Sequence, residues 1–304
     1  MNKKIQEQIQ MLQERWFVIT DQEKILGYLE KVGYHKLLPY FKDANGDIDR
    51  LISYYIFDKR LRFLILDMLE VIENALKSVC INYIWENFSQ KDRYMDKVLY
   101  REECIVNRIK FIENKISEWK INDSKVKNYF SAHASEKTLP DYIFFDKLTF
   151  WELIKIYKDF NLEHQKTIAW YFGINGMLFT DWMYSLKYLR NLCSHYENVF
   201  NKTMTFSVKS RTILQLIENQ NTFVSYFCLL SVFNKLLIPN FGRAQKVIEL
   251  IQKFSIAPRQ IWLDKKNLPS ELESEAWEVL VDKVYSKHII KSNLFDDEDI
   301  YKTN

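Results

Sequence analysis

Apolar residues recur at three- and four-residue steps along most of the chain, which is the spacing of one face of an α-helix. The longest run covers residues 51–88 and predicts a single long amphipathic helix. Shorter runs of the same kind predict further helices over residues 21–33, 102–120, 123–134, 149–160, 163–173, 178–195 and about 210–238.

Several predicted helix ends coincide with residues that start or stop helices. Thr20 followed by Glu23 has the spacing of a capping box, which predicts a helix start there, and Gly33 is a suitable stop. Residues 34–49 are expected to form a connector. The chain after about residue 238 is less regular and predicts a helical tail with a frayed end.

The composition supports an all-α fold. Only six glycines and five prolines occur in 304 residues, so the backbone pattern is rarely broken. With 47% hydrophobic and 27% charged residues, the chain can bury one large core or two modest ones. The formal net charge of +3, from 43 basic and 40 acidic residues, neither requires nor excludes a polyanionic partner, so any nucleic-acid site must be local.

The cysteines and the apolar segments indicate a reduced protein of the cytoplasm. No cysteine lies at the spacing of a zinc site or a redox pair, so we expect neither a metal nor a cofactor. The first residues lack a signal peptide's apolar core. The most apolar segment, residues 223–233, has about half the length of the ~20-residue helix that crosses a bilayer. It therefore predicts a buried core helix and no membrane partner. The cysteines are Cys80, Cys104, Cys193 and Cys228.

The helix expected over residues 178–195 has one apolar and one polar side. At 100° per residue, its core residues fall within a stripe roughly 80° wide, and its polar residues within an arc of roughly 140°. Arg190 and His195 lie at opposite ends of that arc, about 7.5 Å apart along the axis, so both could reach one small anion. In order around the helix, the polar arc holds Arg190, Ser194, Lys187, Asn191 and His195.

These side chains suit RNA hydrolysis without a metal, in which the ribose 2′-hydroxyl attacks the adjacent phosphate. Histidine carries protons near neutral pH, and arginine meets phosphate oxygens with paired donors. His195 would therefore be the general acid or base and Arg190 the phosphate clamp, with Asn191 as an orienting group and Lys187 adding positive potential. The spacing alone is more typical of a solvated polar face than of a catalytic site, and this alternative stays open.

Glu73 lies on the margin of the apolar stripe of the long helix, where a carboxylate needs a partner. It would either orient Arg190 or His195, or pair with a nearby basic residue such as Arg62.

Four segments together resemble one family. "LRNLCSHYENVFN" resembles the LRN-x-C-A-H-H-x-R-x-W-N segment of Abi-like abortive-infection proteins, the AbiD and AbiF group, which carries the R-x4-H motif of HEPN ribonucleases. "VGYHKLLPYF" is similar to the family's GYYRLSGY, and "FDKRLRF" with the helix after it to its fDrkLR segment, which places Glu73 on the family's acidic position. "LTFWELIKIY" is similar to tFGelwkLy, with Trp151 in place of Gly; Tyr196 stands where a second His is common.

The resemblance implies a HEPN-type helical bundle with additional N-terminal and C-terminal helices. Its expected divisions are an N-terminal helical segment (1–47), a HEPN core (48–238) with a helical insertion at about 89–148, and a C-terminal tail (239–304). It also implies a metal-independent endoribonuclease that leaves 2′,3′-cyclic phosphate and acts as a toxin in phage defence. Arg190, His195 and Asn191 would be catalytic; Lys187, Ser194 and Glu73 would bind RNA or support the site.

The implied partners are the RNA substrate, a small non-coding RNA antitoxin and a second copy of the chain. HEPN nucleases place two R-x4-H motifs together, and this chain has one, so a two-fold homodimer is expected. Two other interpretations stay open. One is an RNA-binding HEPN module without catalysis, and the other is a dimeric interaction protein.

Overall fold

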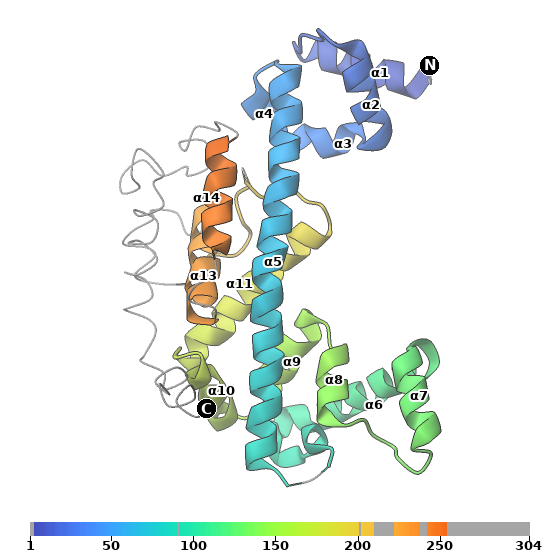
Figure 1. Ribbon diagram of the computed structural model, residues 1–304, viewed down its shortest axis with the longest axis vertical. Helices are drawn as coiled ribbons and strands as arrows, with labels where there is room; N and C mark the ends of the chain where they lie inside the picture. The colour runs from blue at the N-terminus through green and yellow to red at the C-terminus, as the bar shows by residue number, and fades with distance from the viewer. Residues whose placement is uncertain (1–2, 90, 201, 210–221, 238–241, 254–304) are drawn as a thin grey trace, which may run out of the picture. The chain divides into compact units, whose positions relative to one another are not determined.

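The computed structural model describes residues 3–89, 91–200, 202–209, 222–237 and 242–253 (Figure 1). All regular structure in these residues is helical, and the only β-type pairs among them are two isolated bridges, Val18 with Asp47 and Tyr100 with Phe160. The predicted all-α class is therefore confirmed.

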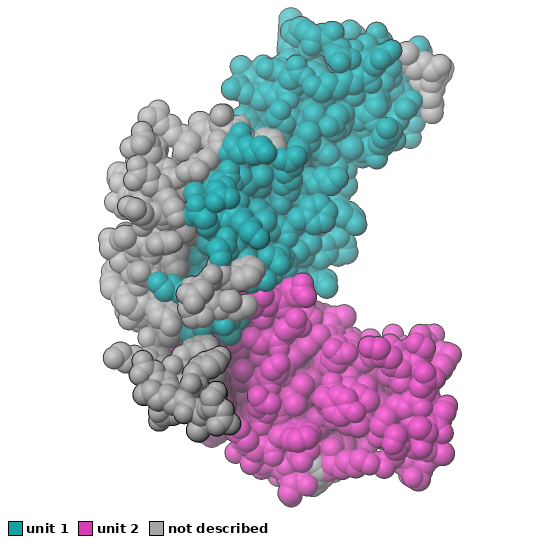
Figure 2. Space-filling view, viewed as in Figure 1, with its two compact units in different colours: residues 1–69, 188–281 teal, residues 70–187, 282–304 magenta. Residues whose placement is uncertain are grey.

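The chain forms two compact units (Figure 2). Unit 1 takes its described residues from 1–69 and 188–281, and unit 2 takes them from 70–187. The long helix α5 (Ile48–Asn87) and the later helix α11 (Gly176–Ser194) each contribute residues to both units. The division predicted at residues 47 and 238 stays a prediction.

Unit 1 contains the N-terminal helices, the first half of α5, the end of α11 and two later helices. The apolar run predicted at 51–88 is confirmed as α5, with Phe57, Leu61 and Ile65 fully buried in unit 1. The other elements of this unit are α1 (Lys3–Glu14), α2 (Gln22–Lys31), α3 (Tyr34–Leu37), the 3-10 turn η1 (Leu38–Tyr40), α4 (Phe41–Ala44), α13 (Phe223–Leu237) and α14 (Arg243–Lys253).

The start of α2 differs from the predicted capping box. Asp21 is the cap, because its side chain accepts a hydrogen bond from the backbone amide of Lys24 at 2.9 Å, and the helix begins at Gln22. Thr20 therefore lies outside the helix. Gly33 follows the helix with φ of +88°, so the predicted stop is confirmed.

The connector predicted at 34–49 is mostly helical, as α3, η1 and α4 follow one another in short turns. The series ends at Asn45 and Gly46, which adopt φ of +49° and +80°. A Cβ at Gly46 would lie 2.7 Å from the carbonyl oxygen of Trp16, so only glycine fits there without movement.

α13 is buried along nearly its whole length, which confirms the prediction that residues 223–233 form a core helix. Asn234, also buried, donates its side-chain amide to the carbonyl oxygen of Leu230 at 2.9 Å. Within the described part of the chain, no helix is long and apolar enough to span a membrane. The irregular tail predicted after about residue 238 contains the described helix α14.

Unit 2 holds the remaining helices. The helices predicted at 102–120, 123–134, 149–160 and 163–173 are confirmed with small shifts of their ends, and a short helix after Pro140 was not predicted. The elements are α6 (Ile105–Asn122), α7 (Ser124–Ala132), α8 (Asp141–Lys147), α9 (Phe150–Asp159) and α10 (Leu162–Tyr171), with 3-10 turns η2 (Arg93–Met95), η3 (Lys97–Leu99) and η4 (Glu102–Cys104).

Candidate functional site

His195 lies just beyond the end of α11, not within a helix as the sequence predicted. The helix ends at Ser194, and Tyr196 adopts a left-handed conformation with φ of +58°. The amide of Tyr196 donates to Cys193 O at 3.2 Å, and that of Glu197 donates to Leu192 O at 2.9 Å. These two bonds form a Schellman motif, which terminates a helix in this way.

The three predicted catalytic side chains surround this helix end. The side chain of His195 is exposed, and those of Arg190 and Asn191 are half-buried. The backbone amide of His195 donates to Asn191 O at 3.0 Å, so these two residues are tied to one helical turn. Within the described residues, none of the three side chains makes a hydrogen bond or ion pair.

The predicted supporting residues on α11 engage other groups. Ser194 donates its hydroxyl to the carbonyl oxygen of Arg190 at 2.8 Å, a bond that satisfies the helix end. In unit 2, the ammonium of Lys187 lies 3.9 Å from the centre of the Trp151 ring, in a cation–π contact. Lys155 approaches the same ring at 5.4 Å, so Trp151 contacts two lysines.

Glu73, also in unit 2, pairs with Lys77 one helical turn later at 3.2 Å, and both side chains are largely buried. Lys77 in addition donates to the carbonyl oxygen of Asp146 at 3.2 Å. The carboxylate thus has a basic partner, as one of the two interpretations of Glu73 expected, but this partner is not Arg62.

Arg62 instead belongs to a buried cluster around Asp58, which sequence reasoning missed. The side chain of Asp58 is completely buried, and its carboxylate accepts from the Tyr40 hydroxyl and the Arg62 guanidinium, both at 2.6 Å. It also accepts from the backbone amides of Val199 and Phe200 at 3.1 Å. We call Tyr40, Asp58 and Arg62 the Asp58 cluster.

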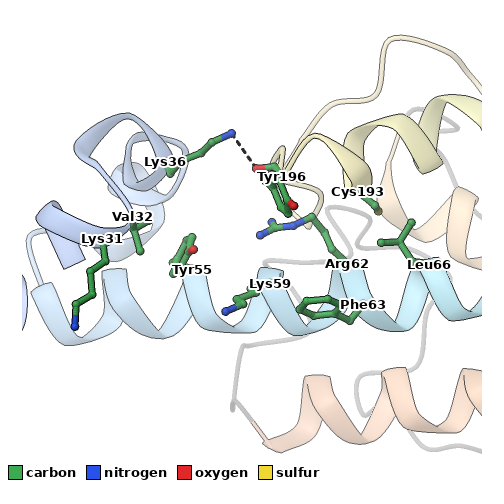
Figure 3. Close-up of a pocket in the computed structure, with 10 residues that line it drawn as sticks. All are labelled: Lys31, Val32, Lys36, Tyr55, Lys59, Arg62, Phe63, Leu66, Cys193 and Tyr196. Carbon is green, nitrogen blue, oxygen red and sulfur yellow. Dashed lines mark hydrogen bonds between the residues drawn. The ribbon is translucent and has the colours of Figure 1, made fainter. Parts of the chain in front are cut away.

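The Asp58 cluster and one lysine fix the backbone that follows α11. Arg62 donates to the carbonyl oxygen of Glu197 at 3.1 Å. Lys36 of α3 donates to the carbonyl oxygens of His195 and Tyr196 at 3.4 and 3.2 Å; the second of these bonds is drawn in Figure 3. Basic groups are favoured at a helix C-terminus, where the last carbonyls lack partners. The loop of residues 195–200 is therefore held from two sides.

Burial governs the electrostatics of this cluster. It raises the pKa of the Asp58 carboxyl, while the Arg62 guanidinium, the Tyr40 hydroxyl and the two backbone amides act against that rise. Burial also raises the pKa of the Tyr40 hydroxyl and of the Cys193 thiol. Cys193 is therefore a packing residue and not a reactive thiol.

One sequence signal could have revealed the cluster. Asp58 lies between Phe57 and Leu61 in the apolar stripe of α5, with Arg62 one turn later. A carboxylate in such a stripe must be paired, and a basic residue at i+4 is the nearest candidate. The backbone amides of residues 199 and 200 could not have been found in this way, because they meet Asp58 only through the fold.

Three of the segments that carry the family resemblance meet in unit 1. "VGYHKLLPYF" supplies Lys36 and Tyr40, and "FDKRLRF" supplies Asp58 and Arg62. "LRNLCSHYENVFN" supplies the loop of residues 195–200. Among the described residues, no three His, Cys, Asp or Glu side chains are grouped as metal ligands.

Comparison with known proteins supports the family resemblance. A family model described as Abi-like protein matches residues 27–201, which is more than half of the chain. The protein therefore belongs to the Abi-like family, whose name connects it with abortive infection, a defence against phage. No curated protein and no solved structure matches the chain.

Proposed function

We propose that this protein is a metal-independent endoribonuclease of abortive infection, with His195 and Arg190 at its catalytic centre. One observation carries the proposal. The backbone around His195 is held by Lys36 and the Asp58 cluster, while the side chains of His195, Arg190 and Asn191 have no partner within the described residues. A fixed backbone that presents unpaired polar groups is suited to a ligand that brings its own charge.

The reaction assigns one role to each group. The ribose 2′-oxygen attacks the neighbouring phosphorus and loses its proton to a base, and the bond from phosphorus to the 5′-oxygen breaks as that oxygen takes a proton from an acid. The products are a 2′,3′-cyclic phosphate and a 5′-hydroxyl. His195 would carry one of the protons, Arg190 would stabilise the added charge on the phosphate, and Asn191 would orient one of them.

A dimer would supply both proton carriers. The reaction uses a base and an acid, and each chain contributes one R-x4-H motif. In a two-fold homodimer, His195 of one copy would act as the base and His195 of the other as the acid. Because an unrestrained ribonuclease would injure its own cell, the proposal includes a small RNA that restrains it.

The test is to incubate wild type and His195→Ala with total RNA in excess EDTA and to analyse the fragment ends. We expect wild type alone to cut, leaving cyclic phosphate. His133→Gln is the matched control, because His133 is exposed in unit 2 and far from α11 in sequence, and we expect it to cut like wild type.

Four results would contradict this proposal in whole or in part. Cleavage by His195→Ala would exclude His195 as the proton carrier. RNA binding without cleavage by wild type, after removal of any co-purified RNA, would favour an RNA-binding module, and dimerisation without RNA binding would favour an interaction protein. Cleavage by a monomer would reject the paired arrangement alone.

A further inference from the structure

Unit 1 contains a pocket of about 310 Å³ beside the end of α11 (Figure 3). Its walls come from α2, α3, α5 and α11 with the turn that follows α11. The lining residues are Lys31, Val32, Lys36, Tyr55, Lys59, Arg62, Phe63, Leu66, Cys193 and Tyr196.

The charge of this pocket is strongly positive. Four of its residues are basic and none is acidic. Arg62 is already compensated by Asp58. Lys36 is bonded only to backbone carbonyls and keeps its full charge, while Lys31 and Lys59 make no ion pair within the described residues. Three uncompensated ammonium groups around one cavity favour an anion, and phosphate is the common biological one.

Aromatic rings provide the second property of the pocket. Tyr196 is 70% exposed and Phe63 is 62% exposed, although both line a cavity. Exposed rings beside a basic groove act as surfaces on which nucleobases stack. Figure 3 shows Lys36 beside Tyr196, with Lys59 and Phe63 on α5 opposite them.

We propose that this pocket is a nucleotide-binding site. Lys36 or Lys59 would hold the phosphate, Lys31 would add positive potential, and Tyr196 or Phe63 would stack on the base. The volume matches the lower end of small-ligand pockets, which is the size of a single nucleotide. This site goes beyond the proposed nuclease, because nucleotide binding here does not require cleavage. Its ligand is either a free nucleotide or one unit of an RNA strand.

The pocket adjoins the proposed catalytic centre. Tyr196 follows His195 directly, and Lys36 bonds to the carbonyl oxygens of both residues. An RNA strand that placed one nucleotide in this pocket would therefore bring a neighbouring nucleotide close to His195.

The experiment uses His195→Ala protein, so that bound RNA is not cut. Binding of a fluorescent single-stranded hexaribonucleotide is measured by anisotropy, and binding of adenosine 5′-monophosphate and of inorganic phosphate by calorimetry. We expect Lys31→Ala/Lys59→Ala to weaken hexanucleotide binding at least tenfold. The slope of log affinity against log salt should fall by up to about 0.7, because the pocket holds one phosphate and each phosphate that a protein neutralises on a single strand adds about 0.7 to that slope.

The matched control is Lys42→Ala/Lys253→Ala, which removes two exposed lysines of unit 1 outside this pocket. We expect it to change affinity less than twofold. Tyr196→Asn tests stacking, because asparagine tolerates the left-handed backbone that Tyr196 adopts. It should weaken binding about tenfold, whereas Tyr196→Phe should bind like wild type.

The three binding measurements distinguish between the possible ligands. Tight binding of adenosine monophosphate that disappears in the double lysine variant identifies a free nucleotide, whereas binding of the hexanucleotide alone identifies a strand. Equal affinities of the double lysine variant and its control would overturn the proposal, as would phosphate binding as tightly as the nucleotide. Either result leaves the cleavage test of wild type untouched, so failure of this site and failure of the nuclease are distinguishable.

Discussion

Two arginines of unit 1 have opposite environments. Arg62 is 5% exposed and bonds to Asp58 and to the carbonyl oxygen of Glu197. Arg190 is half-buried and makes no hydrogen bond or ion pair through its side chain within the described residues. An arginine that faces a buried carboxylate, as Arg62 does, holds the backbone around it. An arginine without such a partner among the described residues, as Arg190 is, can bind a ligand instead.

Removal of Asp58 should break this comparison with the largest effect. Asp58→Ala leaves Arg62 buried without its partner and releases the amides of Val199 and Phe200. We expect the free energy of unfolding to fall by about 3–5 kcal/mol. Chemical denaturation measures this change. Asp58→Asn keeps the shape and one acceptor oxygen, so its free energy of unfolding should fall less. An Asp58→Ala protein as stable as wild type would show that the Asp58 cluster does not hold this backbone.

Removal of Arg190 should show the opposite pattern. Arg190→Ala is expected to lower RNA cleavage about 100- to 1000-fold, because the phosphate loses its charged donor. The free energy of unfolding should change by less than about 0.5 kcal/mol, since Arg190 makes no intramolecular bond through its side chain within the described residues. Cleavage rates and denaturation curves of the same preparation measure both. A stability loss as large as that of Asp58→Ala would assign Arg190 a structural role.

Lys36 lies between these extremes, because it bonds to the backbone at the end of α11 but remains exposed. We expect Lys36→Met to lower the free energy of unfolding by about 1 kcal/mol and to reduce cleavage less than Arg190→Ala does. Lys42→Met, at an exposed position on α4, is the control and should affect neither. Full cleavage by Lys36→Met would show that its bonds do not position His195.

The half-buried His164 of unit 2 contrasts with the exposed His195 of unit 1 and gives the smallest expected effect. His164 of unit 2 contacts the Tyr83 hydroxyl through Nδ1, and burial lowers its pKa. Its unfolded pKa is about 6.5, so the unfolded state binds more protons below that pH. Stability is therefore full above pH 6.5 and is lost as the pH falls through the lowered pKa.

Denaturation midpoints measured between pH 7 and 5 test this assignment. His164→Gln should show a shallower loss of stability with acid than wild type. Tyr83→Phe keeps His164 buried and should retain the wild-type slope, because burial is the main cause of the shift. An unchanged slope in His164→Gln would assign the acid sensitivity to another group.

The helical class and the long helix could be predicted because they depend on periodicity, which each local run of residues carries. The end of α11 could not, because the left-handed turn falls on Tyr196, where the usual glycine or asparagine signal is missing. The contact of Lys187 with Trp151 and the bonds of Asp58 to residues 199 and 200 depend on tertiary packing, which no local pattern contains.

The polar arc of α11 was predicted by helical geometry, but the predicted helix extended one residue too far. Ser194 satisfies its own helix, and His195 follows that helix instead of continuing it. The residues proposed to carry the chemistry were chosen from the sequence and stay a prediction, while the residues that hold their backbone in place were not predicted.

The bonds from Asp58 to the amides of Val199 and Phe200 also set an order in time. During synthesis, the carboxylate emerges from the ribosome more than a hundred residues before those amides exist. A growing chain therefore cannot fix the turn that carries His195 until nearly two thirds of the protein has been made. The turn that carries the proposed proton carrier is therefore held in place only during the last third of synthesis and afterwards.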